Sequence, residues 1–183
     1  MKKILAATIF ILLTNTAAAE NSPEVDEGIA SIKKKTSDFN LETKFFIDKA
    51  APEILLKYKN VSLDWINNDK NFFKLKVNKE IFSLMGTGLE WNVSLNAVDE
   101  NFSVLPSVGV NIYARIRPRL DVYVQFSGLT LGSRGHFSDF ESGLRYFPQK
   151  NFSISAGWRR TDFKLRRNDF DLNGVFAGVR YDF

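Results

Sequence analysis

The sequence contains no cysteine and a single histidine among its 183 residues. The lack of cysteine excludes disulfides, thiolate metal sites and a lipid-modified N-terminal cysteine. Past the N-terminal leader, no stretch is apolar enough to cross a membrane as a helix, which takes about 20 consecutive apolar residues. If the chain enters a membrane, it must do so as a closed β-barrel, because lipid leaves no other way to pair every backbone group.

The chain also lacks a strong charge of either sign. Its formal net charge is +4, and two of the bases, Lys2 and Lys3, lie in the leader. We therefore expect no nucleic-acid partner, because such proteins carry a pronounced basic surface. Phenylalanine, by contrast, is abundant, with 17 residues. Aromatic residues are favoured at membrane interfaces.

The N-terminus predicts export. Lys2 and Lys3 precede an apolar run over residues 4–13, and three alanines at 17–19 follow. This pattern predicts a signal peptide over residues 1–19, cut before Glu20. Residues 20–37 are polar and are expected to lie in the periplasm, either as a short helix or without fixed structure. Residues 38–183 form the predicted barrel domain.

The last fifteen residues, DFDLNGVFAGVRYDF, alternate with a period of two, which is the pleat of a β-strand. One face is apolar and ends in Val179, Tyr181 and Phe183, whereas the other carries Arg180 and glycines. This strand resembles the closing strand of bacterial outer-membrane β-barrels. The resemblance implies that Val179, Tyr181 and Phe183 act as the barrel-closure and assembly signal.

Similar alternating segments of about ten residues run through the chain from residue 38, as expected for a transmembrane barrel. Turns are predicted near Pro118 and Pro148, and longer loops at 97–104, 128–135 and 160–168. The predicted fold is a closed antiparallel up-and-down barrel. Eight strands are favoured if residues 53–66 form one bulged strand and 39–47 lies outside the count. Ten strands result if residues 53–86 hide another hairpin.

The polar faces of these strands supply the expected contents of the lumen. A soluble barrel would place its apolar residues inside instead. Four acids and four bases can pair in a narrow lumen, and they disfavour a solute channel. These residues are Glu90, Arg115, Asp121, Asp139, Glu141, Arg145, Arg159 and Arg180.

The C-terminal half carries a more specific set of motifs. It includes Leu129-Thr-Leu-Gly132, Asp139-x-Glu141-x-Gly143-x-x-Tyr146, Gly157-Trp-Arg-Arg160 and the final Gly174–Phe183 stretch. From Leu105 to Phe183 the chain is similar to a family of small, functionally uncharacterised outer-membrane β-barrel proteins of Gram-negative bacteria. The resemblance implies location and fold and brings no catalytic residues.

His136 and Ser138 form the one catalytic candidate. The pair resembles the site of outer-membrane lipid A deacylases, which use His and Ser two apart on a strand with an acidic partner. A histidine can activate a serine for attack on an ester. The nearest acid, Glu141, has the wrong parity and is expected to point into the lumen. An enzyme is therefore the weaker hypothesis.

The segment 160–168 reads as a basic loop above Trp158, with Arg160, Lys164, Arg166 and Arg167. Guanidinium groups bind phosphate through paired hydrogen bonds. We expect this loop to contact lipopolysaccharide phosphates. The sequence thus predicts a monomeric outer-membrane barrel with a structural or envelope-interaction role. Its expected partners are lipid, lipopolysaccharide and the barrel-assembly machinery, and we expect no metal or cofactor.

Overall fold

The computed structural model describes residues 39–84, 86–99, 103–166 and 168–183. The predicted signal peptide and the polar segment 20–37 lie outside the described residues, as does Arg167. Ten strands and one short 3₁₀ helix make up the described chain. They are β1 (Phe39–Phe46), β2 (Pro52–Tyr58), β3 (Val61–Asn67), β4 (Asn71–Leu84), β5 (Thr87–Val98), β6 (Ser103–Arg117), β7 (Leu120–Thr130), η1 (Gly132–Arg134), β8 (Gly135–Gln149), β9 (Phe152–Leu165) and β10 (Asn168–Asp182).

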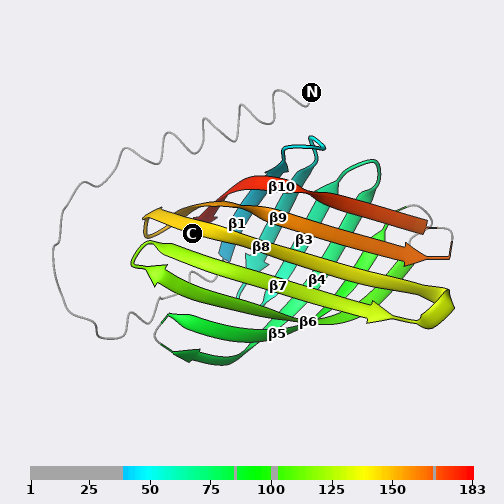
Figure 1. Cartoon of the computed structure of the whole chain (residues 1–183), viewed down its shortest axis with the longest axis horizontal. Helices are drawn as coiled ribbons and strands as arrows, with labels where there is room; N and C mark the ends of the chain where they lie inside the picture. The colour runs from blue at the N-terminus through cyan, green and yellow to red at the C-terminus, as the bar shows by residue number, and fades with distance from the viewer. Residues whose placement is uncertain (1–38, 85, 100–102, 167) are drawn as a thin grey trace. The chain divides into compact units, whose positions relative to one another are not determined.

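Each strand pairs with its sequence neighbour, and β1 pairs with β10, so the sheet is a closed antiparallel up-and-down barrel (Figure 1). The predicted fold class is confirmed, and the barrel has ten strands. The favoured count of eight is wrong because residues 52–67 form a hairpin and not one bulged strand. Lys59 adopts φ 53° in the turn between β2 and β3, and the sequence has no glycine or proline there to indicate a turn. The strand at 39–46 then closes the barrel against β10.

Apolar side chains cover the outside of the barrel and polar ones fill much of the inside. On β10, Val175 is exposed while Phe176, Gly178 and Asp182 are buried. Phe183, exposed at the end of the same strand, packs against the ring of Phe39 with centroids 5.3 Å apart. This arrangement is typical of a barrel whose outer surface meets lipid. Among the described residues, no helix is long and apolar enough to span a membrane.

The strands are staggered around the barrel. Following paired residues from Phe183 through Phe39 and onward around the sheet leads back to β10 at Asp171, twelve residues earlier. Strand tilt and stagger are linked in a closed barrel. One end carries the short turns and Phe183, and we call it the turn end. The opposite end, which carries the longer connections, is called the loop end.

The stagger leaves β8, β9 and β10 projecting at the loop end. β1 pairs with β10 only as far as Phe176, so residues Asn168 to Gly174 extend beyond β1. The β3–β4 connection covers this free edge. Lys70 Nζ lies 2.8 Å from Asp169 Oδ1, and Asn68 donates a hydrogen bond to the carbonyl of Asp171.

The predicted loop at 160–168 is therefore wrong: β9 continues to Leu165 and β10 starts at Asn168. The physical reason is a reversal of polarity at the loop end. There Phe163 points inward and is fully buried, while Lys164 is exposed on the outside. The strand alternation continues here, but the apolar residues now face the lumen and the polar residues face outward. The sequence of this part of β9 therefore resembled a polar loop.

Candidate functional site

The lumen is crossed by a network of charged residues centred on Arg159 of β9. Its guanidinium lies 2.9 Å from Asp139 Oδ1, 3.0 Å from Asp64 Oδ2 and 2.8 Å from Glu53 Oε2. Only 1% of the Arg159 side chain is exposed. Five N–H donors in a rigid plane allow one arginine to bind several carboxylates at once. Arg159 thus joins β2 and β3 to β8 and β9 across the inside of the barrel.

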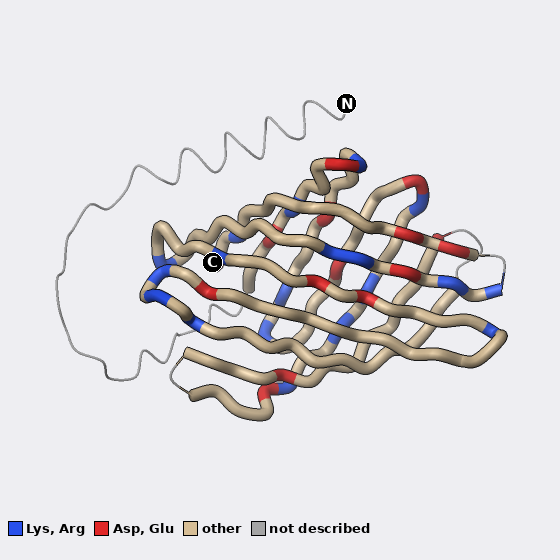
Figure 2. The backbone as a smooth tube through the Cα atoms, viewed as in Figure 1, with Lys and Arg blue, Asp and Glu red and all other residues tan. Residues whose placement is uncertain are grey.

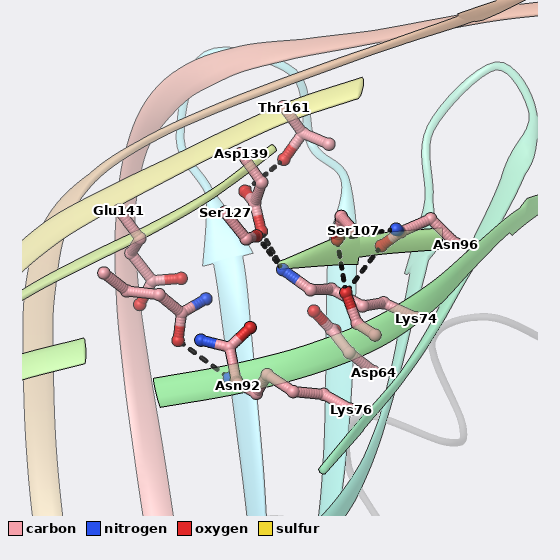
Figure 3. Close-up of polar contacts among 12 residues, drawn as sticks. Asp64, Lys74, Lys76, Asn92, Asn96, Ser107, Ser127, Asp139, Glu141 and Thr161 are labelled. Carbon is pink, nitrogen blue, oxygen red and sulfur yellow. Dashed lines mark hydrogen bonds and ion pairs between the residues drawn. The ribbon is translucent and has the colours of Figure 1, made fainter. Parts of the chain in front are cut away.

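Two lysines extend this network. Lys44 Nζ lies 3.0 Å from Glu53 Oε1 and 2.8 Å from Glu141 Oε1. Lys74 Nζ lies 2.6 Å from Asp139 Oδ2 and donates a second hydrogen bond to Ser127, as Figure 3 shows. Each ammonium is buried between two or more oxygens. The contacts cross the lumen, because Lys44 of β1 and Glu141 of β8 are separated around the barrel by β10 and β9.

The lumen charges of this middle layer balance. Figure 2 shows acidic and basic residues on neighbouring strands across the middle of the barrel. Five acids face five bases, which are Glu42, Glu53, Asp64, Asp139 and Glu141 against Lys44, Lys74, Lys76, Arg145 and Arg159. Lys76 differs from the others because its ammonium donates to the neutral amide of Gln125 at 2.8 Å.

An apolar layer closes the lumen on the loop-end side of this network. Phe72 of β4 stacks on Phe170 of β10 with ring centroids 5.0 Å apart, and it also packs against Phe137 and Phe163. All four side chains are almost completely buried. The same cluster includes Ile66, Val98, Leu105 and Leu172. The projecting strands β8–β10 therefore cover the lumen with their inward apolar side chains.

The turn-end half of the lumen is less tightly filled. Arg115 pairs with Asp121 at 2.9 Å, and Arg180 pairs with Asp182 at 2.7 Å. These side chains are partly exposed, with 36% for Arg115 and 18% for Arg180, against 1% for Arg159. The turn-end half of the lumen is thus more accessible to solvent than the layer around Arg159.

The structure places all eight residues predicted for the lumen on inward-facing positions. Asp139, Glu141, Arg145 and Arg159 join the middle layer. Glu90 accepts a hydrogen bond from Asn111 nearer the turn end. Sequence reasoning missed the partners in the N-terminal half, which are Glu42, Lys44, Glu53, Asp64 and Lys74. The alternation of Glu42 and Lys44 with Leu41 and Thr43 carried the signal for the first two.

A second polar group lies on the outer face at the loop end. His136 Nε2 lies 3.1 Å from Asp162 Oδ1, and Ser138 is the register partner of Asp162 on the neighbouring strand. Glu141 points into the lumen, where Lys44 and Tyr123 bind it. The acid beside His136 is therefore Asp162, which sequence reasoning missed because it assigned residue 162 to a loop.

The residues expected to bind lipopolysaccharide lie partly on a strand. Arg160 and Lys164 are exposed on the outer face of β9, and Arg166 lies in the β9–β10 turn with φ 57°. Asp162 stands between the two strand bases on the same face. The outer surface is thus mixed in charge at this end. The described residues contain no group of three or more His, Asp or Glu side chains that could hold a metal ion.

No family model matches the sequence, and no curated protein matches it. One solved structure, described as "NanC porin structure in rhombohedral crystal form", is similar with 9% sequence identity and a TM-score of 0.49. The match covers 79% of this chain and 100% of that chain.

Proposed function

We propose that the protein is an outer-membrane β-barrel with a closed lumen and a structural or envelope-interaction role. The apolar outer surface and the polar interior support the membrane location. The predicted signal peptide agrees with export. The turn end, with Phe183, then faces the periplasm, and the loop end faces outward. The resemblance of Leu105–Phe183 to small outer-membrane barrels supports the same topology.

The observation that carries this proposal is the double closure of the lumen. In the middle of the lumen, Arg159 binds carboxylates on strands across the barrel. Next to this network, a layer of packed phenylalanine rings fills the lumen. An ion that entered from the turn end would have to separate several buried ion pairs and then pass four tightly packed phenylalanine rings. Such a barrel does not conduct solutes, and it can act only through its outer surface and its two ends.

We expect the purified protein to show no stable single-channel conductance in planar lipid bilayers at physiological salt. A porin of known conductance inserted into the same bilayers serves as the control. Insertion of the test protein is verified separately by its heat-modifiable migration on gels. Regular ohmic steps from the wild-type protein would overturn the closed-lumen proposal and favour the narrow solute channel.

We further propose lipopolysaccharide as the contact of the outer face at the loop end. Arg160 and Lys164 lie directly beyond the apolar belt residue Trp158 on the same face of β9. Phosphate groups accept paired hydrogen bonds from guanidinium and a point charge from lysine. The nearby carboxylates of Asp162 and Asp169 make this surface less basic than the sequence predicted.

A second candidate function is a lipid hydrolase, favoured by the hydrogen bond between His136 and Asp162. In this mechanism Ser138 Oγ would attack an ester carbonyl while His136 takes the hydroxyl proton. The alcohol would leave with that proton, and water would then release the fatty acid from the serine. Asp162 would hold the imidazole. No hydrogen bond between His136 and Ser138 is present among the described residues, so a side chain has to turn before catalysis.

The hydrolase predicts a mass change in lipid A. We expect a strain that expresses the wild-type protein to show the same lipid A masses as the Ser138→Ala strain, because the closed-barrel proposal requires no chemistry. Both variants are compared at equal outer-membrane abundance. The loss of one acyl group only in the wild-type strain would establish the hydrolase and replace the non-catalytic role.

A further inference from the structure

The outer surface carries an apolar groove that spans three strands. It has a volume of about 340 Å³ and is lined by Trp91, Asn92, Val108, Gly109, Val110, Phe126 and Gly128. Trp91, Val110 and Phe126 are register partners in one row across β5, β6 and β7. Val108 and Gly128 are partners in the next outward row toward the loop end. Trp91 and Phe126 are exposed and form the aromatic walls.

The groove exists because residue 128 is a glycine. Gly128 lies between Val108 on β6 and Ser138 on β8, and all the other outward positions of β7 carry a side chain. A Cβ atom at position 128 would lie 3.5 Å from the ring of Phe126 and 3.1 Å from the carbonyl of Phe137. A larger side chain at this position would therefore fill the groove. The glycine keeps an opening one strand wide beside Ser138.

The groove ends at a polar surface. The row that contains Val108 and Gly128 continues through Ser138 to Asp162, and His136 binds Asp162 from the next position. Arg160 lies on the same outer face. An apolar groove inside the outward apolar belt that opens onto hydroxyl, imidazole, carboxylate and guanidinium groups suits one kind of molecule, an amphiphile with its chain in the belt and its head group at the loop end.

We propose that this groove holds one acyl chain of lipid A. The choice of lipid A rests on the proposed topology, in which the loop end faces outward, and on the cations of Arg160 and Lys164, which suit a phosphorylated head group. The aromatic walls hold the chain, and the head group lies beside Ser138 and Arg160. Binding requires no hydrolysis, so the inference is independent of the second candidate function.

The test uses two phenylalanine substitutions on the outer face of β6. Val108→Phe places a ring in the groove, whereas Ile112→Phe adds the same ring two rows away, where Leu89 and Val124 are the partners. The full-length mature protein is folded in detergent and titrated with purified lipid A, and bound lipid is counted by native mass spectrometry. We expect one tightly held lipid A in the wild type, at least tenfold weaker binding in Val108→Phe, and binding within twofold of wild type in Ile112→Phe.

Gly128→Leu provides a second groove-filling variant if Val108→Phe folds poorly. Phosphatidylethanolamine of matched chain length is titrated in parallel and should be displaced by lipid A. Equal binding by Val108→Phe and Ile112→Phe, or binding of the phospholipid as tight as that of lipid A, would overturn the inference. The closed-lumen proposal is unaffected by either result, because conductance tests it separately.

Discussion

Replacing Arg159 with methionine is expected to destabilise the barrel by about 3–5 kcal/mol, the cost of removing one partner from a buried ion pair. Asp139, Asp64 and Glu53 all lie within 3.0 Å of its guanidinium, and none of these side chains is more than 7% exposed. Methionine fills much of the volume but leaves these carboxylates without their shared cation. Urea titrations of the protein folded into lipid vesicles measure the effect.

Arg180→Met is the matched control, because it makes the same change in the lumen near the turn end. Arg180 pairs with Asp182 alone among the ion pairs of the described residues, and its side chain is 18% exposed to solvent. Partial hydration reduces the value of an ion pair, so this variant should lose roughly half as much stability or less. Equal losses in the two variants would contradict the central role of Arg159.

Val124→Arg is expected to cost about 2–4 kcal/mol, the penalty for a cation on the lipid face near the bilayer midplane. Val124 is 37% exposed and lies outward on β7 between Ile112 and Ser142. Because lipid cannot hydrate a guanidinium, the charge must reach an interface or leave the membrane. The same vesicle titration measures the change.

The neighbouring residue offers an inward control for this prediction. Gln125 accepts a hydrogen bond from Lys76, whose ammonium has no carboxylate within 4.0 Å in the described structure. Gln125→Glu would supply one, and because pairing with Lys76 offsets the cost of burying the new carboxylate, this variant should lose less stability than Val124→Arg. A larger loss for Gln125→Glu than for Val124→Arg would mean that the two faces of the barrel are assigned the wrong way round.

Sequence periodicity predicted the fold well because an apolar outer face and a polar lumen impose it along most of the strands. The faces of β10 follow directly from the alternation of Val179 and Tyr181 with Arg180 and Asp182. The strand count was wrong because the β2–β3 turn contains no glycine or proline. Lys59 adopts the left-handed conformation there instead. The sequence allowed either a bulged strand or a further hairpin in this region, and the pairing of β2 with β3 decides between them.

The candidate site was harder to predict, because its contacts join distant strands. Nothing local links Arg159 to Glu53 or Asp64, which come together only when the barrel closes. The role of Asp162 beside His136 was not predicted for a different reason. Beyond the apolar belt the polar residues lie outside and the phenylalanines inside, so a rule that assigns apolar residues to lipid fails there. The groove depends on Gly128 and its neighbours on two other strands.

The pairing of β1 with β10 also determines how the chain folds. Nine of the ten strand contacts join sequence neighbours and can form early as hairpins, whereas Phe46 and Phe176 must meet across 129 intervening residues. Closing a loop of that length carries a large entropic cost and slows folding. The Arg159 and Lys44 contacts that span the lumen need the same closure. The ion pairs that Arg159 and Lys44 make across the lumen with Glu53 and Glu141 therefore depend on barrel closure, so closing the sheet also neutralises these buried charges.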